Sequence, residues 1–201
     1  MNIFLPPQGG TQIKHVSLMS RYLNGGGMMF TATAAKMAAN AEIWAGGKKA
    51  IEMYKGVEQR VSKRAADVGA SYTIVRAGTL KGGAVGDPAD TESGEPTFLD
   101  PFFYSLGQQD VVNWRLLFDC SSLGVQLTRG DTLPGPGFTA ALTATAPEAG
   151  DGDSHRGAVA SALVEALSSP AAADADFSVK STASRVFPTM EEWAGMFDKV
   201  A

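Results

Sequence analysis

The feature that most constrains the fold is a helix that leads within a few residues into an apolar strand. Between residues 50 and 68, apolar side chains recur at spacings of three and four, and charged or amide side chains occupy the other faces. Gly69 follows in the position typical of a helix C-terminus. Residues 71–78, SYTIVRAG, are rich in β-branched and aromatic side chains and predict a buried strand. This order is the second half of a parallel βαβ unit and predicts an α/β fold.

Shorter elements are predicted on either side of this unit. Gly46 and Gly47 are expected to end a preceding helix, and Thr189 is expected to cap the closing one. Residues 81–154 are rich in Gly, Pro and Asp and predict a long irregular section with one helix around 108–119. The other predicted elements are strands at 13–20 and 175–181 and helices at 28–44, 156–170 and 189–200.

Composition limits the classes of protein to consider. The chain of 201 residues, 44% of them hydrophobic, fits one domain with a sizeable core. Its net charge of −4 argues against a nucleic-acid surface. A single cysteine, Cys120, excludes an internal disulfide and is typical of an intracellular, reducing compartment. No apolar run is long enough to span a membrane, and the N-terminus MNIFLPPQGG lacks the features of a signal peptide.

The order of these segments resembles the latter half of the atypical short-chain dehydrogenase/reductase family, NAD(P)-binding Rossmann proteins of which many are found in plastids. In that family, the helix before a YTIvRpG segment carries a lysine followed three residues later by a glutamate, matched here by Lys55 and Glu58. The segment HRGAVA resembles a short R-x-D-V-A type motif of the family, with Gly157 and Ala158 where an aspartate often lies. The resemblance covers most of residues 13–82 and 155–200.

The resemblance implies a Rossmann-like parallel sheet that lacks its N-terminal βαβ units. Residues 1–201 would then be one partial domain, and 81–154 an irregular cap inserted into it. Such a sheet would have an open edge and uncovered apolar faces. Either about 80 to 120 residues precede the sequence given, from the usual size of two or three βαβ units, or a partner completes the fold.

The resemblance also assigns four candidate cofactor-binding residues. Lys55 would bind the nicotinamide ribose, and Ser20 would lie at the strand end that carries the family's catalytic Ser or Thr. Ala77 and Gly78 would form the loop that passes the nicotinamide, with Ala77 in place of the usual proline. The alternatives are that Lys55 is a solvated helix lysine and that the Ser20 hydroxyl satisfies nearby backbone groups.

Two parts of a working dinucleotide enzyme are missing from the sequence. The phosphate-binding pattern G-x-G-x-x-G does not occur, and the nearest stretch, GGGMMF at 25–30, ends in Phe30 and is better interpreted as a loop. The catalytic tyrosine of the family lies four residues before the lysine, where this chain has Ile51. NAD or NADP is therefore expected to bind only if an N-terminal part supplies the phosphate loop, and no catalytic residue is assigned.

The spacing of potential metal ligands in the sequence does not indicate a metal-binding site. His15, His155 and Cys120 have no metal-ligand spacing, and DGDSH at 151–155 lacks the further oxygen ligands of a calcium loop. No metal site is predicted.

Aromatic side chains gather within the predicted cap, over 98–118. They are either a pocket wall, a docking surface for a protein or membrane face, or a small core of the cap. Partner docking is the hypothesis adopted for these residues, which are Phe98, Phe102, Phe103, Tyr104, Trp114 and Phe118.

Two functions from different classes follow. The first is a degenerate, non-catalytic member that acts as a structural or assembly subunit of a plastid membrane complex, a location that rests on analogy with plastid relatives. The second is an NAD(P)H-dependent oxidoreductase whose phosphate loop lies in an N-terminal part outside the sequence given. The missing loop and tyrosine favour the first.

Overall fold

A computed structural model describes residues 13–23, 41–82, 120, 122–133 and 148–201, and these are the described residues below. They form an α/β structure around a mixed four-stranded sheet of order β1-β2-β6-β4. A second, two-stranded sheet pairs β3 with β5 in parallel. The elements are β1 (His15–Arg21), α2 (Ala41–Asp67), β2 (Ser71–Ala77), β3 (Thr79–Lys81), β4 (Gly124–Arg129), β5 (Asp153–His155), α6 (Arg156–Glu165), the short 3₁₀ helix η1 (Pro170–Ala172), β6 (Ala175–Thr182) and α7 (Met190–Val200).

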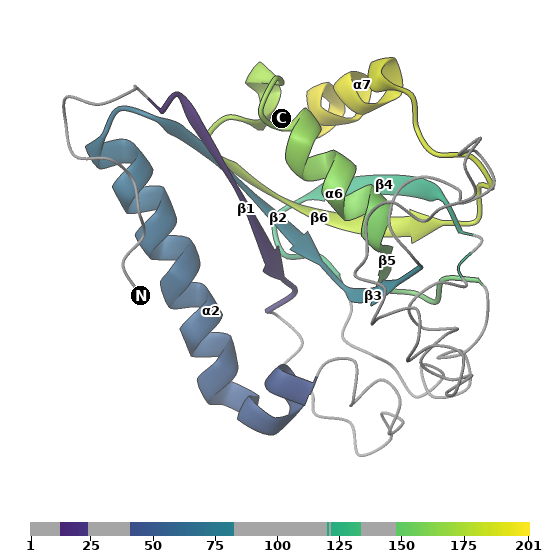
Figure 1. Cartoon of the computed structure of the whole chain (residues 1–201), viewed down its shortest axis with the longest axis horizontal. Coiled ribbons are helices and arrows are strands. Elements are labelled where there is room, and N and C mark those ends of the chain that lie inside the picture. Colours follow the sequence, from purple (N-terminus) through teal and green to yellow (C-terminus); the bar gives the residue numbers. More distant parts are fainter. Residues whose placement is uncertain (1–12, 24–40, 83–119, 121, 134–147) are drawn as a thin grey trace, which may run out of the picture.

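The helices lie on both faces of the larger sheet. Figure 1 shows α2 on one side of the strands and α6 and α7 on the other. Because side chains alternate along a strand, Ser20 and Arg76 face α2, whereas Val75 and Phe177 face α6 and α7. The strands are therefore covered in the three-layer manner of α/β proteins.

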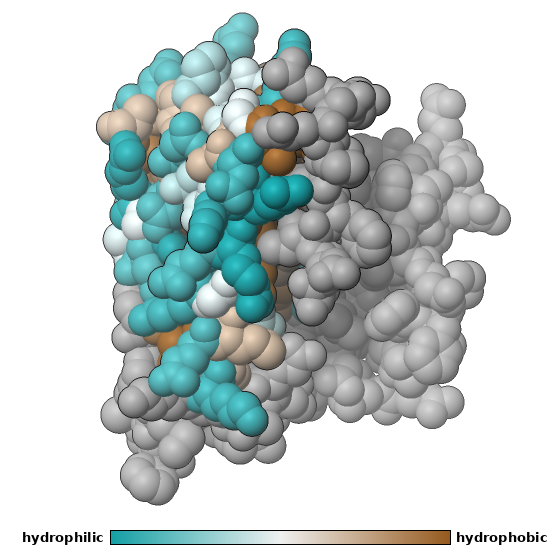
Figure 2. All heavy atoms as spheres, turned by 90° about the vertical axis from the view of Figure 1, so that its left-hand side faces the viewer, coloured by the Kyte–Doolittle hydropathy of each residue, from teal (hydrophilic) through white to brown (hydrophobic). Residues whose placement is uncertain are grey.

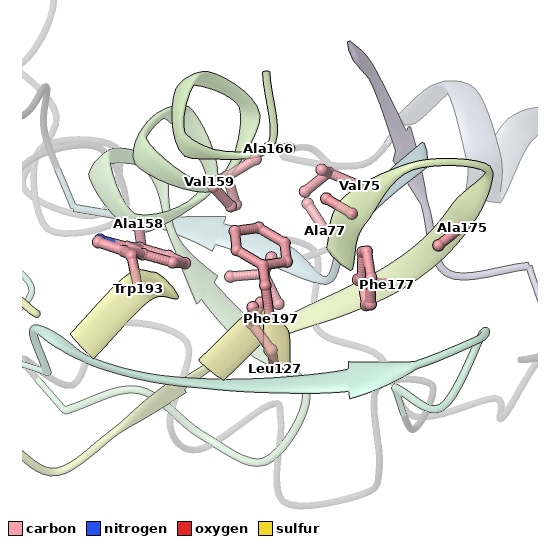
Figure 3. Packing of buried hydrophobic residues seen from close by; sticks show 13 residues of the cluster. Val75, Ala77, Leu127, Ala158, Val159, Ala166, Ala175, Phe177, Trp193 and Phe197 are labelled. Atoms are coloured by element: carbon pink, nitrogen blue, oxygen red, sulfur yellow. The ribbon is translucent and has the colours of Figure 1, made fainter. Parts of the chain in front are cut away.

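The hydrophobic core fills the space between the sheet and the helices α6 and α7 (Figure 3). Phe177 of β6 is fully buried and meets Phe197 of α7 edge to face, with ring centroids 5.3 Å apart. Trp193 stacks on the other side of Phe197 at 6.3 Å. Small residues of α6, including Ala158 and Ala162, are also fully buried and let that helix approach the strands closely.

Most elements predicted from the sequence are confirmed. The helix α2 ends in a Schellman motif, in which Ala70 N donates to Ala65 O at 2.9 Å and Gly69 N to Ala66 O at 3.1 Å. Gly69 has the positive φ of 70° that this motif requires, as its place in the sequence predicted. Thr189 caps α7 in a reciprocal capping box with Glu192.

Several predictions are wrong. The sheet is not wholly parallel, because β4 runs antiparallel to β6, and β4 lies inside the section 81–154 that was expected to be irregular. The helix α2 runs without a break through Gly46 and Gly47. A glycine costs a helix only about 1 kcal/mol, which a helix of 27 residues tolerates. The helix α6 ends at Glu165, before the proline that was expected to close it.

Some predictions lie outside the described residues. These are the helix at 108–119, the loop at 25–30, most of the helix at 28–44, and the aromatic residues proposed for docking. Among the described helices, none combines the length and apolar character needed to cross a membrane.

Candidate functional site

The carboxyl ends of the parallel strands are where an α/β protein usually binds its ligand. The sheet places Ser20 opposite Arg76 and Arg21 opposite Ala77 on adjacent strands. Ser20, Ala77 and Gly78 therefore lie at this end of the sheet. Ala77, which the resemblance placed in a loop, is instead the last residue of β2 and is buried in the core. Lys55 lies on an exposed part of α2, one turn before Glu58, whose carboxylate binds the buried Ser20.

The Ser20 hydroxyl belongs to a buried charge network that joins α2 to three strands. It donates to Oε1 of Glu58 at 2.5 Å. Arg76 donates to the same carboxylate from Nε at 3.0 Å and from Nη2 at 2.8 Å. Nη1 of Arg76 binds Asp176 of β6. The network ties one helix to β1, β2 and β6 and leaves Ser20 with a structural partner.

Electrostatics favour the charged form of Arg76 inside this network. Burial alone would lower the pKa of its guanidinium, but the hydrogen bonds and charges of Glu58 and Asp176 raise it above its ordinary value. The side chains of Arg76 and Glu58 are each 9% exposed, so water screens their attraction little. The pair is a fixed contact at neutral pH.

Gly78 allows two segments of backbone to approach closely. A Cβ atom at this position would lie 1.8 Å from the carbonyl oxygen of Gly152. The Gly78 amide donates to Ser154 Oγ at 2.8 Å, and that hydroxyl donates to Val179 O at 2.5 Å. Packing against residues 152–154 thus explains the glycine, and its amide is already bound within the chain.

A buried lysine lies beyond Gly78 in β3. The side chain of Lys81 is fully buried, and its Nζ donates to Glu148 O at 2.8 Å. The same Nζ lies 4.0 Å from Oδ2 of Asp153 in β5. Tyr22, which follows β1, is also buried there, and its pKa is raised by burial and by the Asp153 carboxylate against the opposing charge of Arg21. A carboxylate, an ammonium and a phenol are therefore held near the carboxyl ends of the strands.

His155 joins β5 to α6 and caps that helix. Its Nδ1 accepts from Gly157 N at 3.0 Å, and its ring meets Phe187 edge to face at 5.1 Å. Burial, and then the charge of Arg156, lowers the pKa of His155 to about 4. The imidazole is consequently neutral at pH 7, with the proton on Nε2, because Nδ1 serves as an acceptor.

Sequence reasoning missed the buried partners of these residues. Glu58 was noted only as a match to the family, yet it lies four residues after Tyr54 and three before Val61, on the apolar stripe of the helix. Arg76 interrupts an otherwise apolar strand in the same way. A charge on a buried face usually has a buried counter-charge, and this rule would have paired the two.

The chemistry available to the described site is limited. Ser20 and the Gly78 amide already bind other parts of the chain. No group of His, Cys, Asp and Glu within the described ranges is arranged to hold a metal ion. A scan of protein-family models and searches of curated proteins and of solved structures find no match to this chain.

Proposed function

We propose that this chain is a degenerate NAD(P)-binding-fold protein that serves as a non-catalytic structural or assembly subunit of a protein complex. One observation carries the proposal: the hydroxyl of Ser20 donates to the buried Glu58 carboxylate at 2.5 Å. A serine that takes part in proton transfer must offer its hydroxyl to the substrate. Here the hydroxyl joins a helix to the sheet instead.

The neighbouring cofactor candidates support the same function. Gly78 packs against the backbone of residue 152 and has its amide bound by Ser154, where a nicotinamide would need open space. Lys55 is exposed, whereas Ser20 is buried and already bound to Glu58, which favours a structural role for Ser20. These contacts favour a structural role for Ser20 and Gly78 over a role in binding a dinucleotide.

The outer surface supports attachment to other proteins on the side of α6. Figure 2 looks onto the side of the molecule that carries α2, where the described surface is mostly hydrophilic. On α6, in contrast, Ala160 and Val164 are exposed and spaced by one turn, and exposed Leu167 follows three residues later. Val164 is 63% exposed and Leu167 is 51% exposed. An apolar stripe on a covering helix is a typical contact surface for a partner.

The location in the proposal is a plastid membrane complex. It comes from the resemblance to plastid members of the family. The structural role does not depend on it, so the two parts of the proposal are tested separately.

Native mass spectrometry of the protein isolated from its source, followed by titration with NADPH and NADH, tests the structural role. We expect the chain to be found in an assembly with other polypeptides and to leave the fluorescence of both nucleotides unchanged. A free monomer that binds NADPH at micromolar concentration would overturn the proposal and favour the oxidoreductase. Imaging a fluorescent fusion in the source cells tests the location.

A further inference from the structure

Strand β1 forms one edge of the four-stranded sheet. Among the described strands, β2 is its only neighbour, and the register from His15–Ser71 to Arg21–Ala77 is regular. The backbone on the far side of β1 therefore has no strand partner among the described residues. An edge of this kind readily accepts another extended segment, because that segment supplies donors and acceptors at the matching spacing.

The hydrogen bonds at the two ends of β1 show which residues point outward. Lys14 O accepts from Ser71 N at 3.0 Å, and Tyr22 N donates to Ala77 O at 3.1 Å. Even-numbered residues therefore direct their backbone groups at β2. The amides and carbonyls of residues 15, 17, 19 and 21 point to the open edge, because successive residues of a strand alternate.

The side chains along this edge indicate the chemistry of the segment that fits. Met19 is 44% exposed and offers apolar contact area to a neighbouring strand. Lys14 is exposed and Arg21 is partly exposed, one at each end of the strand. Residues 14–21 contain no acidic side chain. A segment with an apolar middle and acidic ends complements this pattern.

We propose that the outer edge of β1 binds an extended, acid-flanked segment of another protein, which adds to the sheet as a further strand. This deepens the structural role proposed above and rests on it. A second copy of this chain fits less well. Two β1 strands paired about a twofold axis run antiparallel and bring basic ends together, and like charges across a strand pair are destabilising.

A synthetic peptide tests the edge directly. The probe is as long as β1, alternates valine and threonine, and has glutamate at both ends. N-methylation of alternate residues leaves it one hydrogen-bonding edge, so that it cannot form assemblies larger than a pair, and the like charges of the terminal glutamates disfavour even the pair when its strands are parallel and in register. We expect the full chain to bind it and to lose at least about tenfold in affinity when lysine replaces the glutamates. Equal binding of both peptides, or of a control methylated at every residue, would overturn the proposal.

Two variants at residue 19 test whether the backbone amides of β1 contribute to binding of the peptide. Met19→Pro removes an outward amide and spares the ladder to β2, whereas Met19→Ala shortens the side chain and keeps the amide. We expect Met19→Pro to bind the acidic peptide at least about tenfold more weakly than Met19→Ala. Equal affinities of two folded variants would contradict strand addition. If Met19→Pro does not fold, hydrogen exchange on the wild type decides: the amides of residues 15, 17, 19 and 21 must gain protection when the peptide binds.

The natural assembly separates this inference from the structural role. An assembly that forms equally well with Met19→Pro and Met19→Ala would leave the structural role intact and place the partner elsewhere, overturning strand addition. A homodimer in which the outward amides of β1 are protected from exchange would show that a second copy of this chain occupies the edge. That result would overturn the proposal of an acid-flanked segment from another protein. A monomer that binds NADPH would overturn the structural role, and the inference with it.

Discussion

Arg76 and Glu58 form a bidentate ion pair between strand β2 and helix α2, with N–O distances of 3.0 and 2.8 Å. Each side chain is 9% exposed, and Ser20 and Asp176 bind the same pair from β1 and β6. The charges lie beneath the only described helix that covers this face of the strands. The position of α2 on the sheet therefore depends on a polar contact as well as on apolar packing.

Removing one partner of this pair should be costly. Glu58→Ala leaves the Arg76 guanidinium buried without its main counter-charge, and we expect the free energy of unfolding to fall by about 3 to 5 kcal/mol. Urea denaturation followed by circular dichroism measures the change. Asp67→Ala is the control, because it removes an exposed carboxylate from the same helix and should change stability by less than about 0.5 kcal/mol. Equal effects of the two substitutions would show that the ion pair does not hold the helix.

Gly78 provides a second test of structure against cofactor binding. A methyl group at residue 78 would meet the Gly152 backbone at 1.8 Å, and backbone cannot move aside as a side chain can. We expect Gly78→Ala to lower the free energy of unfolding by more than about 2 kcal/mol. Gly56→Ala in α2 has open space around the new Cβ and should instead stabilise the protein by about 0.5 to 1 kcal/mol. A Gly78→Ala variant as stable as the wild type would contradict the close packing.

The sequence predicted the elements whose signals are local. The Schellman end at Gly69 and the capping box at Thr189 depend on residues within one turn of helix, and both are present. Strand β4 was missed because its sequence, GVQLTR, is short and starts with glycine. Its pairing with β6 joins residues about fifty positions apart, from Gly124 with Thr182 to Arg129 with Phe177. Contacts of that sequence separation override local propensity.

The strand ends that carry the candidate residues were predicted from the sequence, and the buried partners of those residues were not. Ser20 and Gly78 do lie at the carboxyl ends of adjacent strands, because strand order in an α/β fold fixes where those ends meet. Their partners, Glu58 and Ser154, come from other elements and were not identified. A single sequence gives the ends of the strands more readily than the side chains that fold over them.

Acid should destabilise the protein through His155. Its pKa is lowered to about 4 in the folded chain, whereas the unfolded chain has the ordinary value of 6.5. Between these values the unfolded state binds more protons, so the stability contributed by the neutral imidazole is complete above pH 6.5 and is lost as the pH falls towards 4. Protonation of Nδ1 also removes the acceptor for Gly157 N. We expect the urea concentration at the midpoint of unfolding of the wild type to decrease as the pH is lowered from 7.5 to 4.5.

His155→Asn isolates this contribution, because asparagine is a good helix N-cap and does not titrate in this range. His15, whose pKa is also lowered by burial, is present in both proteins, so its effect cancels in the comparison. The wild type should lose stability relative to His155→Asn as the pH falls below 6.5. A stability difference that is independent of pH would show that His155 does not titrate differently in the two states.

Ser20 and Lys55 distinguish the two functions most directly when they are changed separately. Ser20→Ala removes a hydroxyl that donates to a buried carboxylate, so we expect the free energy of unfolding to fall by about 1.5 to 3 kcal/mol. Lys55→Ala changes an exposed side chain and should alter stability by less than about 0.5 kcal/mol. Thermal unfolding with and without NADPH measures the stability of each protein and the stabilisation by the nucleotide in one experiment. If the two residues form a ribose site, NADPH raises the melting temperature of the wild type, and each substitution reduces that increase. The structural role instead predicts no increase for any of the three proteins and a lower melting temperature for Ser20→Ala alone.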